Sequence, residues 1–165
     1  MIHGNETKSV LDYFFSALNM ISLEISDVFI QNGETDIEIS CLVKCSDPTI
    51  NIGIHLMRSN KSILYIWKNE IHWHDLDLRN RSEATAKASC SDGDLSYLRV
   101  EIPSSMIKPS KDTGSYMCRL IGLTSYGGFL GEDSEKVMLK VIGNLIYVLF
   151  TRKDCLLVNA NKYRI

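Results

Sequence analysis

The segment at residues 112–118 constrains the fold more than any other stretch, because it reads Asp-x-Gly-x-Tyr-x-Cys. A tyrosine two residues before a cysteine is the sequence form of a tyrosine corner, in which the phenol hydroxyl bonds to upstream backbone. Gly114 permits the turn before the strand, since it lacks the Cβ that resists such conformations. We therefore expect Tyr116 to pack beneath a corner and Cys118 to face the core of a strand.

Other segments carry the two-residue alternation of half-buried strands. Residues 37–43 place Ile37, Ile39, Cys41 and Val43 on one face. Residues 97–102 turn a second apolar row inward, and Pro103 ends that strand. Its inward residues are Leu98, Val100 and Ile102. The pattern predicts strands at 23–30, 35–44, 50–56, 62–68, 83–90, 97–102, 115–121 and 134–142.

The segments around Cys41 and Cys118 resemble the immunoglobulin superfamily. The resemblance implies an all-β chain folded as an immunoglobulin-like antiparallel β-sandwich over residues 23–142, with a Cys41–Cys118 disulfide between the sheets. It also implies that Asp112 pairs with an arginine at the base of the strand at 83–90, with Arg81 as the nearest candidate and Arg79 behind it. Closing so long a loop stabilises by roughly 4–5 kcal/mol in the chain-entropy model, and such bonds persist in oxidising surroundings. An extracellular or secreted location follows from the resemblance.

The third strand departs from the family pattern. A tryptophan is usual there, about a dozen residues after the first cysteine. Here the region offers Ile54 and Leu56, and the two tryptophans, Trp67 and Trp73, come later. We expect aliphatic side chains to replace the indole in the core. In the next strand, Ile63, Tyr65 and Trp67 are expected to share one face.

The two ends of the chain are less regular. Residues 1–22 form a leader that is helical, disordered or an atypical secretion signal, because Asp12 and Asn19 interrupt its apolar run. We favour an incomplete N-terminus as the explanation. Residues 143–165 form an irregular tail that either adds a strand or remains disordered. Its apolar run at 145–150 is too short to cross a bilayer.

Three cysteines remain after the first pairing, namely Cys45, Cys90 and Cys155. A second bond between Cys45 and Cys90 is one hypothesis, because both lie near strand ends of one sheet. Three Asn-x-Ser/Thr sequons, at Asn5, Asn60 and Asn80, are candidate glycosylation sites.

Composition and motifs favour a binding module over an enzyme. The net charge of −2 argues against electrostatic binding to nucleic acid. The chain lacks a Gly-rich phosphate loop, a serine nucleophile elbow and a paired zinc-type cysteine motif, so we expect no cofactor. His72-x-His74 followed by Asp75 is a weak metal signal, and a solvated loop is the favoured interpretation. A small intracellular enzyme that uses Cys90 with His72 or His74 is a remote alternative.

A closer resemblance is to the immunoglobulin domains of molluscan fibrinogen-related proteins, which are lectin-like molecules of innate defence. It is carried by Tyr97-Leu98-x-Val100-x-Ile102-Pro103 and by Gly114-x-Tyr116-x-Cys118-x-Leu120-x-Gly122, within residues 23–142. It implies an extracellular recognition or adhesion module. The alternative is an ectodomain fragment of a membrane receptor.

The expected partner is a protein or a glycan. We expect contact through a Gly-rich loop at 122–132, using Tyr126, Phe129 and Leu130. The alternative is that Phe129 and Leu130 fold back and cap the core.

Overall fold

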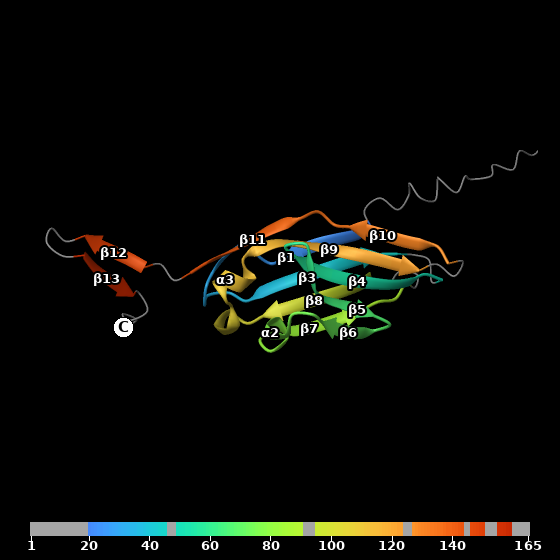
Figure 1. Ribbon diagram of the computed structural model, residues 1–165, viewed down its shortest axis with the longest axis horizontal. Coiled ribbons are helices and arrows are strands. Elements are labelled where there is room, and N and C mark those ends of the chain that lie inside the picture. The colour runs from blue at the N-terminus through green and yellow to red at the C-terminus, as the bar shows by residue number, and fades with distance from the viewer. Residues whose placement is uncertain are drawn as a thin grey trace, which may run out of the picture.

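The computed structural model describes residues 20–45, 49–90, 95–123 and 127–143, and the backbone at 146–150 and 155–159. Two β-sheets pack face to face over a shared apolar core (Figure 1). The predicted all-β sandwich is confirmed.

The smaller sheet has four strands, all paired antiparallel. Their order is β1 (Ile21–Ile25), β3 (Ile37–Lys44), β8 (Leu95–Ile102) and β7 (Glu83–Lys87). The rows predicted to face inward from β3 and β8 are buried, with no member more than 1% exposed, so those predictions are confirmed.

The larger sheet runs from β2 at one edge to β6 at the other. Its order is β2 (Phe29–Gln31), β11 (Val137–Ile142), β9 (Gly114–Leu123), β4 (Asn51–Arg58), β5 (Lys61–Trp67) and β6 (Glu70–Trp73). A further strand, β10 (Phe129–Asp133), pairs with β9, and β2 lies parallel to β11. Ile54 and Leu56 of β4 are fully buried, so aliphatic side chains fill the place of the usual core indole.

Two disulfides hold this arrangement together. The predicted Cys41–Cys118 bond is confirmed and joins β3 to β9 across the core, with Cα atoms 5.7 Å apart. The Cys45–Cys90 bond is also present, with a Cα separation of 5.1 Å. β8 begins at Leu95, which pairs with Lys44 at the end of β3. Cys45 follows β3 and Cys90 lies after β7, so the two cysteines meet beyond the start of β8.

The first predicted strand, 23–30, is split between the sheets. β1 pairs with β3, whereas β2 pairs with β11 in the other sheet. The crossing occurs at Ser26 and Asp27, where the Asp27 carboxylate accepts a hydrogen bond from the Phe29 backbone N–H at 3.0 Å. β1 also begins at Ile21, inside the expected leader, and residues 1–19 lie outside the described residues.

The expectation for the face of β5 was wrong. Ile63 has no partner in the ladder, because the register with β4 shifts between Leu56 and Met57. This β-bulge turns Ile63 inward next to buried Leu64. Tyr65 and Trp67 therefore point away from the core.

Two further segments are more regular than predicted. Residues 69–82, expected as a solvated loop, contain β6 and the short helix α2 (Leu76–Arg79). Asp75 caps that helix by accepting a hydrogen bond from the Leu78 backbone N–H at 3.0 Å. The connection from β8 to β9 holds a 3₁₀ turn, η1 (Ser104–Met106), and α3 (Pro109–Asp112).

The tail expected to be irregular contains paired strands, β12 (Ile146–Phe150) and β13 (Cys155–Asn159). Pairing of the two strands gives hydrogen-bond partners to backbone N–H and C=O groups that would otherwise lack a partner within the chain. Within the described residues, no helix is long and apolar enough to cross a membrane.

The two disulfides are expected to differ in their contribution to stability. Replacing Cys45 and Cys90 by serine should lower the free energy of unfolding by about 2–5 kcal/mol, because the unfolded chain gains freedom. Replacing Cys41 and Cys118 by alanine should cost more, since removing fully buried sulfurs also leaves a cavity. Urea unfolding of both double variants measures this difference, and equal costs would contradict the assigned role of the core bond.

Candidate functional site

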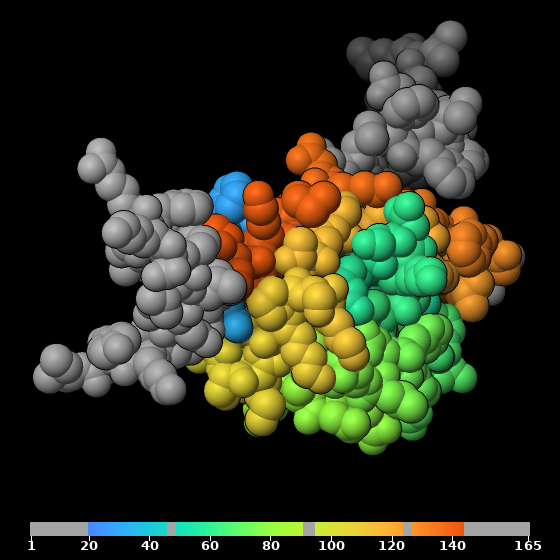
Figure 2. Space-filling view, turned by 60° about the vertical axis from the view of Figure 1, so that its left-hand side comes forward, coloured from blue at the N-terminus to red at the C-terminus, as the bar shows by residue number. Residues whose placement is uncertain are grey.

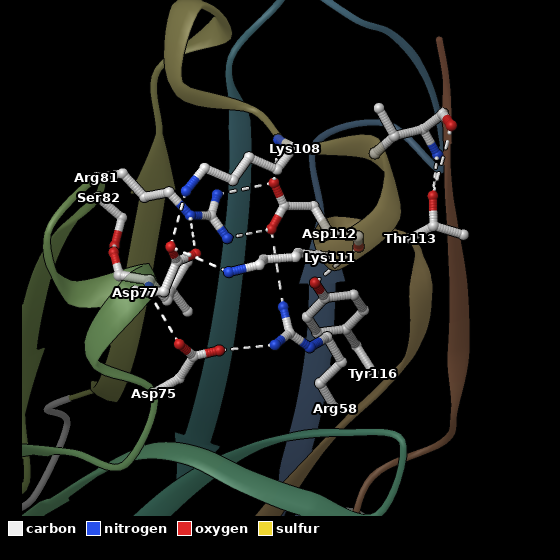
Figure 3. A network of polar contacts seen from close by, with 12 residues as sticks. Arg58, Asp75, Asp77, Arg81, Ser82, Lys108, Lys111, Asp112, Thr113 and Tyr116 are labelled. Carbon is white, nitrogen blue, oxygen red and sulfur yellow. Dashed lines mark hydrogen bonds and ion pairs between the residues drawn. The ribbon is translucent and has the colours of Figure 1, made fainter.

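A buried ion pair closes one end of the sandwich (Figure 3). Arg81 donates two hydrogen bonds to the Asp112 carboxylate, at 2.8 and 2.6 Å, and both residues are buried. The Tyr116 hydroxyl donates to the Asp112 backbone carbonyl at 2.8 Å. The predicted Arg81–Asp112 pair and the tyrosine corner are confirmed, while Arg79 is exposed on α2.

More charged side chains surround this pair and belong to the same network. Lys108, Lys111 and Arg81 all contact the Asp77 carboxylate, and together they hold the pKa of Asp77 well below its usual range. Arg58 donates to Asp75 at 2.7 Å. Burial raises the pKa of Tyr116 to about 12. Within the described residues the network joins four cations to three anions, and Arg58 Nη1, 3.7 Å from Asp112, is buried without a hydrogen-bond partner.

The outward surface of the larger sheet, here called the outer face, carries a row of rings. His55 of β4, Tyr65 of β5 and His72 of β6 are direct cross-strand neighbours. Their rings stack with successive centroids 4.8 Å apart, and His74 meets Tyr65 edge-on at 5.3 Å. We call these four side chains the ring row.

An ion pair flanks the ring row on the neighbouring strands. Arg119 of β9 lies opposite His55 and binds the Asp133 carboxylate of β10 through two contacts, at 2.6 and 2.9 Å. Burial lowers the pKa of His55, and the nearby His74 and Arg119 lower it further. The Arg119 guanidinium lowers the pKa of Asp133.

Trp67 adds an indole to the outer face. The ring lies so close to Gly53 of β4 that a Cβ at this glycine would sit 2.8 Å from Trp67 Cε3. Gly53 therefore allows the indole to lie against the backbone of β4.

The end of the β9–β10 hairpin is apolar and exposed. The expected loop at 122–132 is largely strand, because β9 extends to Leu123 and β10 begins at Phe129. These two residues pair across the hairpin and are 42% and 68% exposed. Figure 2 shows this segment, in orange, projecting at the right of the molecule.

The three residues predicted to contact a partner differ in their surroundings. Phe129 is exposed, whereas Leu130 packs against the core, as strand alternation in β10 requires. Tyr126 lies outside the described residues. Sequence reasoning missed Leu123, as well as His55 and Tyr65, because their grouping depends on strand register.

The corresponding surface of the smaller sheet is mainly charged and polar. Arg99 of β8 pairs there with Glu38 of β3 at 3.2 Å. Its other charged strand residues are Glu24, Lys44, Glu83, Lys87 and Glu101. The two surfaces of the sandwich therefore differ in chemistry.

Both sequons within the described residues lie at the end that carries the ion-pair network. Asn60 is exposed in the β4–β5 turn, and Asn80 caps α2. Asn5 is outside the described residues. Glycosylation stays a prediction, and glycans at Asn60 and Asn80 would leave the hairpin end uncovered.

The described residues bear on two chemical roles for the histidines, metal binding and catalysis with a cysteine thiol. Across the part of the chain that the structure describes, no three His, Cys, Asp or Glu side chains form a metal-binding group. Cys90 is bonded to Cys45, so its thiol is not available to His72 or His74 as a nucleophile.

No protein-family model matches the chain, and no curated protein matches it as a relative.

Comparing the Arg81–Asp112 and Arg119–Asp133 pairs tests how burial changes the effect of an ion pair on stability. Arg81→Met should lower the free energy of unfolding by about 3–5 kcal/mol, because it leaves the Asp112 carboxylate buried and uncompensated. Arg119→Met, at a pair whose side chains are each 44% exposed, should cost less than about 1 kcal/mol. Urea unfolding compares them, and similar losses would contradict a special role for the buried pair.

His55 should make folding stability depend on pH. Its folded-state pKa lies below the unfolded value of 6.5, so its contribution is present above pH 6.5 and is lost as pH falls through the folded-state pKa. The wild-type melting temperature should therefore fall more on acidification from neutral pH than that of His55→Gln. Parallel slopes for the two proteins would show that His55 has no such linkage.

Proposed function

We propose that the chain is a variable-type immunoglobulin-superfamily domain that recognises a partner outside the cell. The sheet order β1-β3-β8-β7 corresponds to strands A, B, E and D of that family. In the other sheet, β11-β9-β4-β5-β6 corresponds to G, F, C, C′ and C″. The inter-sheet disulfide and the tyrosine corner support the same assignment.

The extracellular location is supported by the cysteine chemistry. Two disulfides are bonded within the described residues, and such bonds persist in oxidising compartments. The exposed sequons at Asn60 and Asn80 are compatible with passage through a secretory pathway.

The difference between the two surfaces is the observation that carries the recognition role. Aromatic side chains and arginine are enriched in protein interfaces, whereas lysine and glutamate are depleted. The outer face presents the ring row, Trp67 and Arg119, and Leu123 and Phe129 extend it toward the hairpin end. The smaller sheet presents mainly charges, so the outer face is the contact surface that we propose.

The expected partner is a protein or a glycan of innate defence or adhesion. This class follows from the resemblance to lectin-like defence proteins, and the aromatic outer face suits it. Rigid rings offer large contact area for little loss of side-chain entropy. The sandwich holds them on strands, which fixes their spacing before a partner arrives.

Paired variants on the two surfaces test this role. Leu123→Ser combined with Phe129→Ala should reduce binding of a labelled tetramer to a glycan array or to intact cells by about tenfold or more. The matched control, Leu42→Ser combined with Tyr97→Ala on the smaller sheet, should leave binding within about twofold.

Thermal melting of each variant distinguishes the loss of a partner contact from the loss of folding stability. The hairpin variant should melt near the wild-type temperature, because both altered side chains are exposed. A large fall in melting temperature, loss of binding in the control alone, or no saturable binding to either panel would contradict the proposal.

A further inference from the structure

The turn between β2 and β3 contains Asn32-Gly33, the only Asn-Gly pair in the chain. The side-chain amide of an asparagine can be attacked by the backbone nitrogen of the following residue, and glycine obstructs this attack least because it has no Cβ. We propose that Asn32 is a site of spontaneous deamidation, which converts it to aspartate and isoaspartate and loosens β2 at the edge of the larger sheet.

The turn leaves room for the reaction. Gly33 is exposed, and its φ of +85° is a conformation that residues with a Cβ resist. Within the described residues, no atom beyond its chain neighbours lies within 4 Å of the place that a Cβ would take. The turn is closed by a hydrogen bond from the Glu34 N–H to the Gln31 carbonyl oxygen, at 3.2 Å. A single exposed bond of this length opens at low cost, so the backbone can reach the reactive conformation.

The Asn32 side chain is available for the reaction. The residue is half-buried, and no hydrogen bond to another described residue restrains its side-chain amide. Two exposed asparagines in other turns are held by their side chains. The Asn60 side-chain oxygen accepts a hydrogen bond from Lys136 Nζ at 3.1 Å, and that of Asn69 accepts one from the Ala88 N–H at 3.2 Å. Each of these two also precedes a residue with a long side chain, so sequence and structure both single out Asn32.

Asparagine is a thermolabile residue, and its loss of ammonia needs only the chain and water. The Gly33 backbone nitrogen forms a bond to Asn32 Cγ, the bond from Cγ to the side-chain nitrogen breaks, and ammonia leaves with the proton of the Gly33 N–H. Water then opens the cyclic imide at one of two bonds. Cleavage between the ring nitrogen and Cγ gives aspartate, whereas cleavage between that nitrogen and the backbone carbonyl carbon gives isoaspartate. Ammonia is exchanged for water, and nothing is oxidised or reduced.

The isoaspartate product alters the point where β2 leaves the sheet. The main chain then runs through Cβ and is one atom longer, so the turn cannot keep its present closing bond. The new carboxylate is attached to the Cα of residue 32, whose N–H donates to the Ile142 carbonyl oxygen at 2.9 Å, and its charge repels that oxygen. Because β2 pairs with β11 only over Phe29–Gln31, we expect this short edge strand to open more often.

Ageing of the folded full chain at neutral pH, followed by peptide mass spectrometry, tests the site. Asn69 is the matched control, because it also lies in an exposed turn but precedes Glu70. Asn32 should lose ammonia at least about tenfold faster than Asn69. Its rate in the folded chain should stay within about tenfold of its rate in urea, because the turn opens locally. Equal rates at the two asparagines, or stronger protection of Asn32 by folding, would overturn the proposal.

Hydrogen exchange measures the effect on the sheet. In the aged protein the backbone amides of β2 should exchange about threefold or more faster, while those of β10 keep their rate. Asn32→Gln keeps the amide but disfavours closure of the ring, so it should abolish both the mass change and the faster exchange. Asn32→Ser is a second variant that cannot deamidate. Unchanged exchange in the aged wild-type protein, or the same increase in the aged variants, would overturn the proposal.

Discussion

The Cys41–Cys118 disulfide is the constraint on which the sandwich depends. It joins the central strands β3 and β9, so each sheet is fixed to the other near its middle. Leu98 lies beside Cys41 in one sheet and Leu56 beside Cys118 in the other, and all four side chains are fully buried. The covalent link and the aliphatic packing therefore act at the same place, and the outward surfaces are left free to differ.

The two ends of the sandwich are stabilised by different physics. At one end, the Asp112 carboxylate is removed from water and receives hydrogen bonds from Arg81 and the Lys108 backbone N–H. A buried carboxylate tolerates few changes, because an unpaired charge there costs several kcal/mol. At the other end, the β9–β10 hairpin depends on backbone pairing, and its outward residues Leu123 and Phe129 contribute little to the core. Substitutions of the outward residues of the hairpin are therefore expected to lower stability less than substitutions of the buried ion pair.

Local sequence predicted the parts of the fold that local chemistry determines. Alternation predicted the inward rows of β3 and β8, and the Asp-x-Gly-x-Tyr-x-Cys segment predicted the corner. The arginine partner of Asp112 was predicted from the resemblance to the immunoglobulin superfamily. The split of the first strand and the bulge at Ile63 were missed, because each depends on pairing with distant segments. The ring row was missed for the same reason. His55, Tyr65 and His72 are separated along the chain and become neighbours only through the registers of β4, β5 and β6.

The absence of a tryptophan from the core affects the outer face as well as the core packing. Ile54 and Leu56 fill the core position of β4, and the indole of Trp67 lies instead on the opposite side of that strand, over Gly53. The indole of Trp67 is thus half-buried next to the ring row. A partner that covered a ring such as Phe129 would gain roughly 2 kcal/mol from apolar burial alone. The imidazole edges of His55, His72 and His74 add hydrogen-bonding groups beside this apolar surface.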